Sequence, residues 1–154
     1  MSDMMDLQAA ARATAGRLQG DNRSFTGVST DSRTLNSGDL FVALRGDNFD
    51  GHDYLAAAQG RGAVAAIVAA DAAVPSQAGG LPTIEVADTR LSLGALAAEW
   101  RSRFVLPLIA VTGSNGKTTT KEMIASILQA AHPGAVLATR GNYNNDIGLP
   151  LTLL

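Results

Sequence analysis

Short apolar runs alternate with polar turns over the first half of the chain. Four runs have the length and composition of buried strands, at residues 24–28, 40–44, 65–68 and 83–86. Helical spacing predicts helices at 7–15 and 52–61, and Gly62 stands where the second of these would end. The stretch 69–82 is rich in Ala, Pro and Gly, which predicts a loop. These elements together indicate a small α/β unit.

A longer helix is expected after this unit. Asp88 is a suitable N-cap for a helix that runs to residue 104. One face of that helix is apolar and carries Leu93, Leu96, Ala97, Trp100 and Phe104. We interpret Trp100 as a packing residue because it belongs to this face. A domain boundary is expected between residues 86 and 87, which gives a domain at 1–86 and a second, truncated one at 87–154.

The rest of the chain continues the alternation. The pattern predicts a buried strand, an amphipathic helix, a further strand and the start of a last helix, at residues 108–111, 118–129, 134–138 and 149–150. The buried stripe of the amphipathic helix would consist of Met123, Ile124, Ile127 and Leu128. Strands that alternate with helices indicate an α/β fold with a mainly parallel sheet.

The turn before the amphipathic helix is the strongest functional signal. It reads Thr112-Gly113-Ser114-Asn115-Gly116-Lys117-Thr118-Thr119. Glycines allow positive φ, and the N–H groups of such a turn point at an anion. Lys117 supplies a charge for the β- and γ-phosphates, and the Thr118 hydroxyl can hold Mg²⁺.

The alternative is a glycine-rich turn that binds nothing, because Val111 replaces the first glycine of the general P-loop pattern. The chain has only two lysines, at positions 117 and 121, against ten arginines. A lysine in this turn therefore favours phosphate binding.

Composition excludes several classes of protein. Hydrophobic residues make up 46% and charged residues 17%, which is typical of a globular chain. The net charge is −2 without a basic block, so no nucleic-acid partner is indicated. No cysteine is present, which excludes disulfides and thiolate metal sites. No apolar run is long enough to span a membrane and the first residues lack a signal-peptide pattern, so a cytoplasmic protein is expected.

Two polar segments each allow two interpretations. Ser29, Thr30, Asp31, Ser32 and Arg33 could bind a uracil ring or a diphosphate, or could form a capped turn. Residues 141–148 include Asn142, Asn144 and Asn145, whose amides suit sugar or phosphate oxygens. Asparagine also tolerates left-handed backbone, so the residues alone slightly favour a tight turn for this second segment.

A metal site at His52 is not supported by the sequence. The other histidine, His132, is distant and no ligand spacing is present. We expect Asp50 or Asp53 to serve as a first-turn acid where the helix begins.

The phosphate turn resembles the ATP loop of the Mur ligases and of their relatives, the folylpolyglutamate synthetases. That family's loop lacks the distal glycine, which accounts for Val111. Further matching segments lie at residues 29–33, 38–46, 49–53, 121–123 and 141–154. Together they resemble the Mur ligases that add D-alanyl-D-alanine, over nearly the whole chain.

The resemblance implies a small N-terminal UDP-binding α/β domain, followed by the start of a P-loop-type, mainly parallel α/β ATPase domain. Ser29 to Arg33 would hold the UDP end of the substrate. Residues 113–119 would bind ATP, with Lys117 catalytic and Thr118 at Mg²⁺. Asn142, Asn144 and Asn145 would line the meeting point of ATP and substrate.

The resemblance also implies a reaction. ATP would activate the tripeptide carboxylate of a UDP-N-acetylmuramoyl tripeptide, and D-alanyl-D-alanine would attack, in a monomeric full enzyme. Because only 37 residues follow Lys117, we expect a fragment that is catalytically silent and self-associates. The alternatives are a Mur ligase that adds a diamino acid, or a nucleotide- or UDP-sugar-binding module without ligase chemistry.

Overall fold

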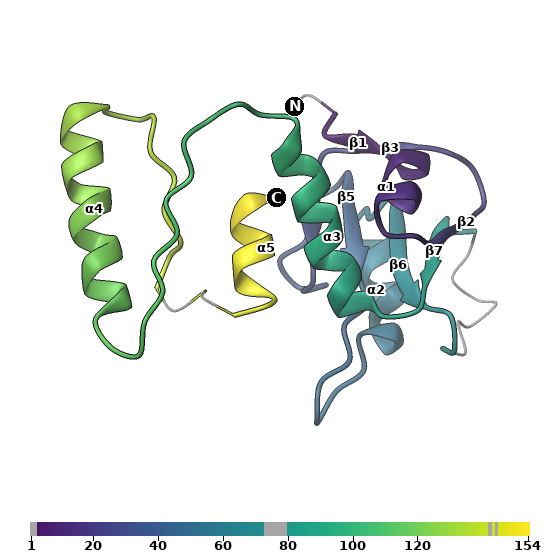
Figure 1. The fold of residues 1–154 in the computed structure, drawn as a ribbon. Helices are drawn as coiled ribbons and strands as arrows, with labels where there is room; N and C mark the ends of the chain where they lie inside the picture. Colours follow the sequence, from purple (N-terminus) through teal and green to yellow (C-terminus); the bar gives the residue numbers. More distant parts are fainter. Residues whose placement is uncertain (1–2, 73–79, 142, 144) are drawn as a thin grey trace.

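The computed structural model describes residues 3–72, 80–141, 143 and 145–154. Its centre is a five-stranded sheet with the order β2-β7-β6-β5-β4 (Figure 1). The strands are β2 (Arg17–Gln19), β4 (Gly27–Ser29), β5 (Asp39–Val42), β6 (Ala65–Ala69) and β7 (Thr83–Val86). β4 to β7 pair in parallel and only β2 is antiparallel, so the mainly parallel α/β prediction is confirmed.

Helices cover both faces of this sheet. They are α1 (Leu7–Ala13), the 3-10 helix η1 (Gly51–Tyr54), α2 (Leu55–Gly60) and α3 (Thr89–Ser102). Alternate residues of one strand point to opposite faces. Val42 accordingly packs in the cluster with α1 and α3, while Phe41 packs with α2 on the other face.

The predicted strand at 24–28 is two strands in different sheets. β3 (Ser24–Phe25) pairs with β1 (Met5–Asp6) in a separate two-stranded sheet, and β4 begins at Gly27. Phe25 is fully buried, which anchors the small sheet to the main core. β1 and β2 were not predicted, because two or three residues are too few to show a period.

The prediction of a long helix capped by Asp88 is confirmed by α3. Asp88 Oδ1 accepts hydrogen bonds from the N–H groups of Arg90 and Leu91, at 2.8 and 3.0 Å. Leu93 and Leu96 are fully buried in the core that α3 shares with α1 and the central sheet. Trp100 packs partly against the same core, in agreement with its interpretation as a packing residue. The boundary between residues 86 and 87 stays a prediction.

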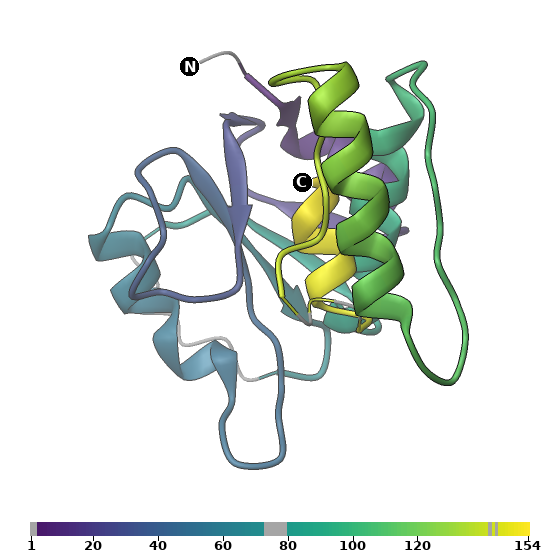
Figure 2. The same ribbon diagram turned by 90° about the vertical axis from the view of Figure 1, so that its left-hand side faces the viewer.

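The last two helices differ sharply in their surroundings. α5 (Gly148–Leu153) packs along α3, as both views show (Figures 1 and 2). α4 (Lys117–Ala131) confirms the predicted helix, but none of its residues is buried. The expected buried stripe is therefore wrong, with Met123 and Ile127 well exposed.

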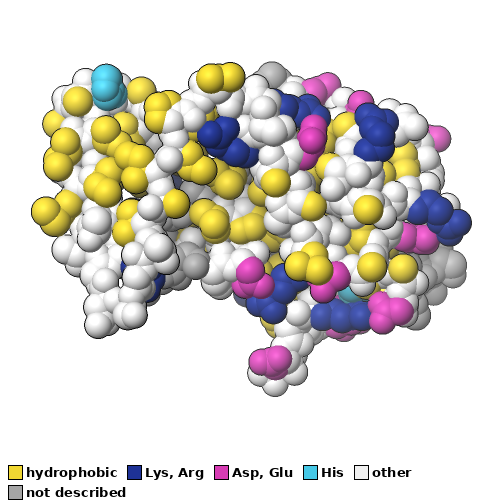
Figure 3. Space-filling view, in the orientation of Figure 1, with side chains coloured by type: hydrophobic (Ala, Val, Ile, Leu, Met, Phe, Trp, Pro, Cys, Tyr) yellow, Lys and Arg dark blue, Asp and Glu magenta, His cyan; other side chains and the backbone are white. Residues whose placement is uncertain are grey.

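The strands predicted at 108–111 and 134–138 are also wrong, because both segments lack regular secondary structure. They run in one direction and α4 returns in the other, which is the order of a strand–helix–strand unit (Figure 1). A strand needs a hydrogen-bonded neighbour, and among the described residues neither segment has one. Their apolar side chains, with those of α4, form the large hydrophobic area at the left of Figure 3.

A hydrogen bond to His52 joins the segment after β5 to the end of β6. The buried His52 ring accepts a hydrogen bond at Nε2 from the Ala69 N–H, at 2.9 Å. Nδ1 then carries the proton and donates to Asp50 Oδ1 at 2.5 Å. Asp50 is the N-cap of η1, where it accepts a hydrogen bond from the His52 N–H. The predicted first-turn acid is confirmed at Asp53.

We predict that His52→Ala lowers the free energy of unfolding by about 1–3 kcal/mol, because the Ala69 N–H loses its acceptor inside the core. Chemical denaturation of the protein that carries this chain measures the change. His132→Ala is the matched control, since residue 132 is exposed. Equal stability of both variants would contradict this role for His52.

Candidate functional site

The predicted site segments gather at one end of the molecule. β4, β5 and β6 run in parallel, so the residues that follow them lie at a common edge of the sheet. This edge holds residues 29–33 after β4 and the hairpin 45–50 after β5. The loops that precede α4 and α5 lie at the same, lower end in Figure 1. Ligands of open parallel sheets bind at such an edge.

Residues 29–33 form a turn with strong internal bonding. Arg33 donates from Nε and Nη2 to the two carboxylate oxygens of Asp31, at 2.9 and 2.8 Å. These bonds lower the pKa of Asp31 to about 2 and raise the pKa of Arg33. Ser29 Oγ bonds the Asp31 backbone, Ser32 is buried and Thr30 is partly buried. The capped turn is therefore present, and it holds the exposed Arg33 guanidinium in a fixed orientation.

A second arginine holds the neighbouring hairpin. Arg45 forms ion pairs with Asp50 at 3.2 Å and with Asp71, which follows β6, at 2.9 Å. The hydrogen bond from Arg45 is the main cause of the lowered pKa of Asp71. The pKa of Asp50 is lowered chiefly by its hydrogen bond from the His52 backbone. The loops after β5 and β6 are thus joined by charge at the edge where Arg33 lies.

The backbone of the predicted phosphate loop takes conformations at two positions that favour glycine. Gly113 has φ +145° and Gly116 has φ +76°, and Gly116 leads directly into α4. A Cβ at Gly116 would meet nothing within 4 Å, so the left-handed backbone is what favours glycine there. Lys117 Nζ donates to the Gly113 carbonyl at 2.5 Å, which places the ammonium group over the loop.

The other predicted residues of this loop are open to solvent. Ser114, Asn115, Thr118 and Thr119 are all exposed at the start of α4. No hydrogen bond joins the Thr118 hydroxyl to another described side chain or carbonyl, so the hydroxyl is free to bind a cation. Among the described residues, no group of three or more His, Cys, Asp or Glu side chains could hold a metal ion. Thr118 thus offers one hydroxyl oxygen, and the prediction that it holds Mg²⁺ beside phosphate oxygens stays a prediction.

The asparagine-rich loop is partly described. Asn142 and Asn144 lie outside the described residues. Asn145 Oδ1 accepts hydrogen bonds from the N–H groups of Ile147 and Gly148, at 3.3 and 2.6 Å, and so caps the start of α5. Asp146 pairs with Arg90 of α3 at 2.7 Å. The end of this loop is therefore tied to the helix that follows β7.

The sequence did not predict two contacts near the site, the Arg90–Asp146 pair and a hydrogen bond from Lys121. The Arg90–Asp146 pair joins residues far apart in sequence, and no periodic signal reveals such a pair. Lys121 donates to the Thr139 carbonyl at 2.6 Å. Its spacing of four residues from Lys117 could have suggested a shared helix face.

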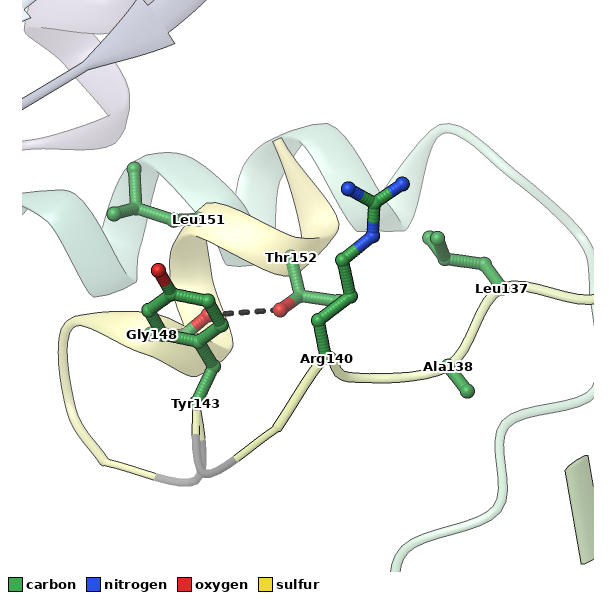
Figure 4. Close-up of a pocket in the computed structure, with 7 residues that line it drawn as sticks. All are labelled: Leu137, Ala138, Arg140, Tyr143, Gly148, Leu151 and Thr152. Carbon is green, nitrogen blue, oxygen red and sulfur yellow. Dashed lines mark hydrogen bonds between the residues drawn. The ribbon is translucent and has the colours of Figure 1, made fainter. Parts of the chain in front are cut away.

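A cavity of about 370 Å³ lies beside the asparagine-rich loop (Figure 4). Its lining residues are Leu137, Ala138, Arg140, Tyr143, Gly148, Leu151 and Thr152. The Thr152 hydroxyl donates to the Gly148 carbonyl at 2.9 Å and faces this space. No residue of the phosphate loop lines the cavity, so the cavity is separate from the candidate nucleotide site.

Comparison with known families assigns a class to this arrangement. Residues 24–101 match the description "Mur ligase family, catalytic domain", and residues 111–154 match "Mur ligase middle domain". The chain belongs to the Mur ligase family.

Similar individual proteins narrow the comparison. A UDP-N-acetylmuramoyl-tripeptide–D-alanyl-D-alanine ligase of Synechocystis is 50% identical over 82% of this chain and 27% of its own length. The crystal structure of MurF from Acinetobacter baumannii has a TM-score of 0.82 and 42% identity, over 95% of this chain and 32% of that one. MurF from Thermotoga maritima in complex with ADP has a TM-score of 0.69 and 37% identity, over 82% and 28%. The chain thus spans about a third or less of the length of these relatives.

In the described parts of the chain, no helix is both long and apolar enough to cross a lipid bilayer.

We predict that Arg33→Ala raises the pKa of Asp31 from about 2 toward its ordinary value of 3.8, because the hydrogen bonds from the Arg33 guanidinium are the largest cause of the lowered pKa. In the unchanged protein, the Asp31–Arg33 pair stabilises the turn above pH 3.8, and this contribution is lost as the pH falls through about 2. A carboxyl-carbon NMR titration measures both midpoints. An unchanged Asp31 midpoint in the variant would contradict the pairing.

Proposed function

We propose that this chain carries the UDP-substrate and ATP-loop regions of an ATP-dependent amide ligase. The enzyme would add D-alanyl-D-alanine to a UDP-N-acetylmuramoyl tripeptide in the synthesis of peptidoglycan precursors. One observation carries the proposal: a glycine-bounded loop with Lys117 above it lies at the same end of the molecule as the Arg33 turn. The relatives that bear this activity by name support the choice of substrates.

The proposal assigns the two ligands to loops in different parts of the chain. Residues 1–86 would recognise the UDP end of the substrate through Ser29, Thr30, Asp31, Ser32 and Arg33. Arg33 uses Nε and Nη2 for Asp31, so Nη1 still offers donors to a diphosphate. Residues 87–154 would supply the nucleotide loop, in which the backbone amides of residues 113–118 would face the phosphates.

The proposed reaction has two steps. The γ-phosphoryl group of ATP passes to the terminal carboxylate of the tripeptide, which gives an acyl phosphate and ADP. The amine of D-alanyl-D-alanine then attacks the acyl carbon, an amide bond forms and inorganic phosphate leaves. Lys117 would hold the phosphates by charge, which is electrostatic positioning rather than covalent catalysis.

Thr118 is the residue of this chain that we assign to Mg²⁺, through its exposed hydroxyl at the start of α4. When bound, Mg²⁺ neutralises charge on the phosphate oxygens. Asn142, Asn144 and Asn145 are proposed for the meeting point of ATP and substrate. Of these, Asn145 uses its carbonyl oxygen to cap α5, so its amide nitrogen would contact the ligand. We place the reaction in the cytoplasm and expect a monomeric enzyme, as the resemblance implies.

We predict that Lys117→Ala weakens the binding of ATP·Mg²⁺ to the intact enzyme by about ten- to a hundredfold. The variant loses a charge-assisted contact of roughly 1.5–3 kcal/mol. Isothermal titration measures the affinity, and Arg12→Ala on α1 controls for the loss of one positive charge. Unchanged affinity and turnover in the Lys117 variant would remove the basis of the nucleotide assignment.

We predict that Arg33→Ala weakens the binding of the UDP-N-acetylmuramoyl tripeptide but leaves the affinity for ATP unchanged, because the turn lies in the proposed UDP region. Titrations with each ligand measure the two effects. Arg23→Ala is the matched control, since Arg23 lies before β3 and its side chain forms a loose ion pair with Asp21, at 3.7 Å. A variant that lost ATP affinity alone would contradict the division of labour.

The choice of acceptor separates the remaining alternatives. The intact enzyme should turn over ATP when D-alanyl-D-alanine is added to the tripeptide substrate. Turnover with diaminopimelate and the shorter dipeptide substrate would instead identify a ligase that adds a diamino acid. Binding without turnover in either assay would identify a nucleotide-binding module.

A further inference from the structure

The two lysines of the chain lie on one face of α4, because residues four apart in a helix are neighbours. Lys117 reaches back to the Gly113 carbonyl of the phosphate loop, at 2.5 Å. Lys121 reaches sideways to the Thr139 carbonyl, at 2.6 Å, and its Nζ lies 3.5 Å from the Gly141 carbonyl. One helix face therefore contacts both the phosphate loop and the segment that leads into the asparagine-rich loop.

The environment of Lys121 differs from that of a surface lysine. Only 17% of its side chain is exposed, although α4 as a whole has no buried residue. Its one ion-pair partner is Glu122 at 2.7 Å, and Glu122 is itself largely in solvent. An ammonium group removed from water needs such partners, and hydrogen bonds from a charged donor are about twice as strong as neutral ones.

Lys121 is also the link between α4 and the segment 133–141. Within the described residues, no backbone ladder pairs this segment with a strand, and the hydrogen bonds that tie it to the body of α4 come from Lys121 Nζ. The position of Gly141 relative to the phosphate loop thus depends on this ammonium group. At its other end the asparagine-rich loop is fixed independently, by the Asp146–Arg90 pair and the Asn145 cap.

We propose that Lys121 is a positioning residue of the ligase, one that holds residues 139–141, which lead into the asparagine-rich loop, against the helix that follows the ATP loop. This inference rests on the function proposed above, in which the two loops meet where ATP and the tripeptide react. Lys121 touches neither reactant. Its ammonium group holds a backbone carbonyl, so its loss would misplace one reactant against the other without removing a contact to ATP.

The test compares two variants of the intact enzyme with the unchanged enzyme. Lys121→Met keeps the length of the side chain and removes the charge and the donors, so kcat should fall about 10- to 100-fold, the cost of misplaced reactants. The affinity for ATP·Mg²⁺ should change by less than about threefold, because the phosphate loop and Lys117 are intact. Glu122→Gln, which removes the ion pair but leaves the carbonyl bonds, is the matched control and should keep kcat.

The same measurements separate positioning from a purely structural role. A structural role would lower the unfolding temperature and the folded fraction but leave kcat per folded enzyme and ATP affinity unchanged; that result, or an unchanged kcat, would overturn the proposal. If Lys121→Met does not fold, Lys121→Leu, which also removes the charge and the donors, decides in the same way. If Lys117→Ala also leaves ATP binding and turnover intact, the proposed function fails; if only the Lys121 variants are neutral, this inference fails alone.

Discussion

The parallel hydrogen bonding of β4 to β7 is the constraint on which the rest of the structure depends. It places the loops that follow these four strands at one edge, so the Arg33 turn, the Arg45 hairpin and Asp71 become neighbours although they are separated in sequence. The buried alternation of Leu40, Phe41 and Val42 fixes the register of this sheet, because a shift by one residue would exchange its two faces. The electrostatics of the edge are thus a consequence of how the core packs.

Charge then organises the loops that the core has brought together. Arg33 is held by Asp31 and Arg45 by Asp50 and Asp71, so each guanidinium has a defined orientation before any ligand arrives. On the other side of the site, each lysine of α4 donates to a backbone carbonyl. An arrangement of this kind reduces the reorganisation that binding requires, which is how preorganised sites gain affinity and rate.

The sequence predicts the packed half of the chain well and the second half only in part. α3 with its Asp88 cap, β6 and β7 follow from local signals that the core reinforces. The glycine-bounded turn before α4 follows from its local signal alone, because its residues are exposed. β1 and β2 escape prediction, because strands of two or three residues are chosen by their partners rather than by their own pattern. The apolar run at 108–111 has the composition of a buried strand, yet Leu108 is 63% exposed, since a strand exists only where a neighbour completes its hydrogen bonds. Residue types alone predict the phosphate loop, whereas the Arg90–Asp146 pair depends on the packing of α5 along α3.

A crystal structure of the intact enzyme with Mg²⁺, a non-hydrolysable ATP analogue and the UDP-N-acetylmuramoyl tripeptide tests the central claim most directly. The account predicts the triphosphate on the backbone amides of residues 113–118, and the diphosphate of the UDP group within hydrogen-bond distance of the Arg33 turn. Both ligands should then occupy the end of the molecule at which the strands β4 to β7 terminate. A triphosphate bound away from the amides of 113–118, or a UDP group away from residues 29–33, would contradict it.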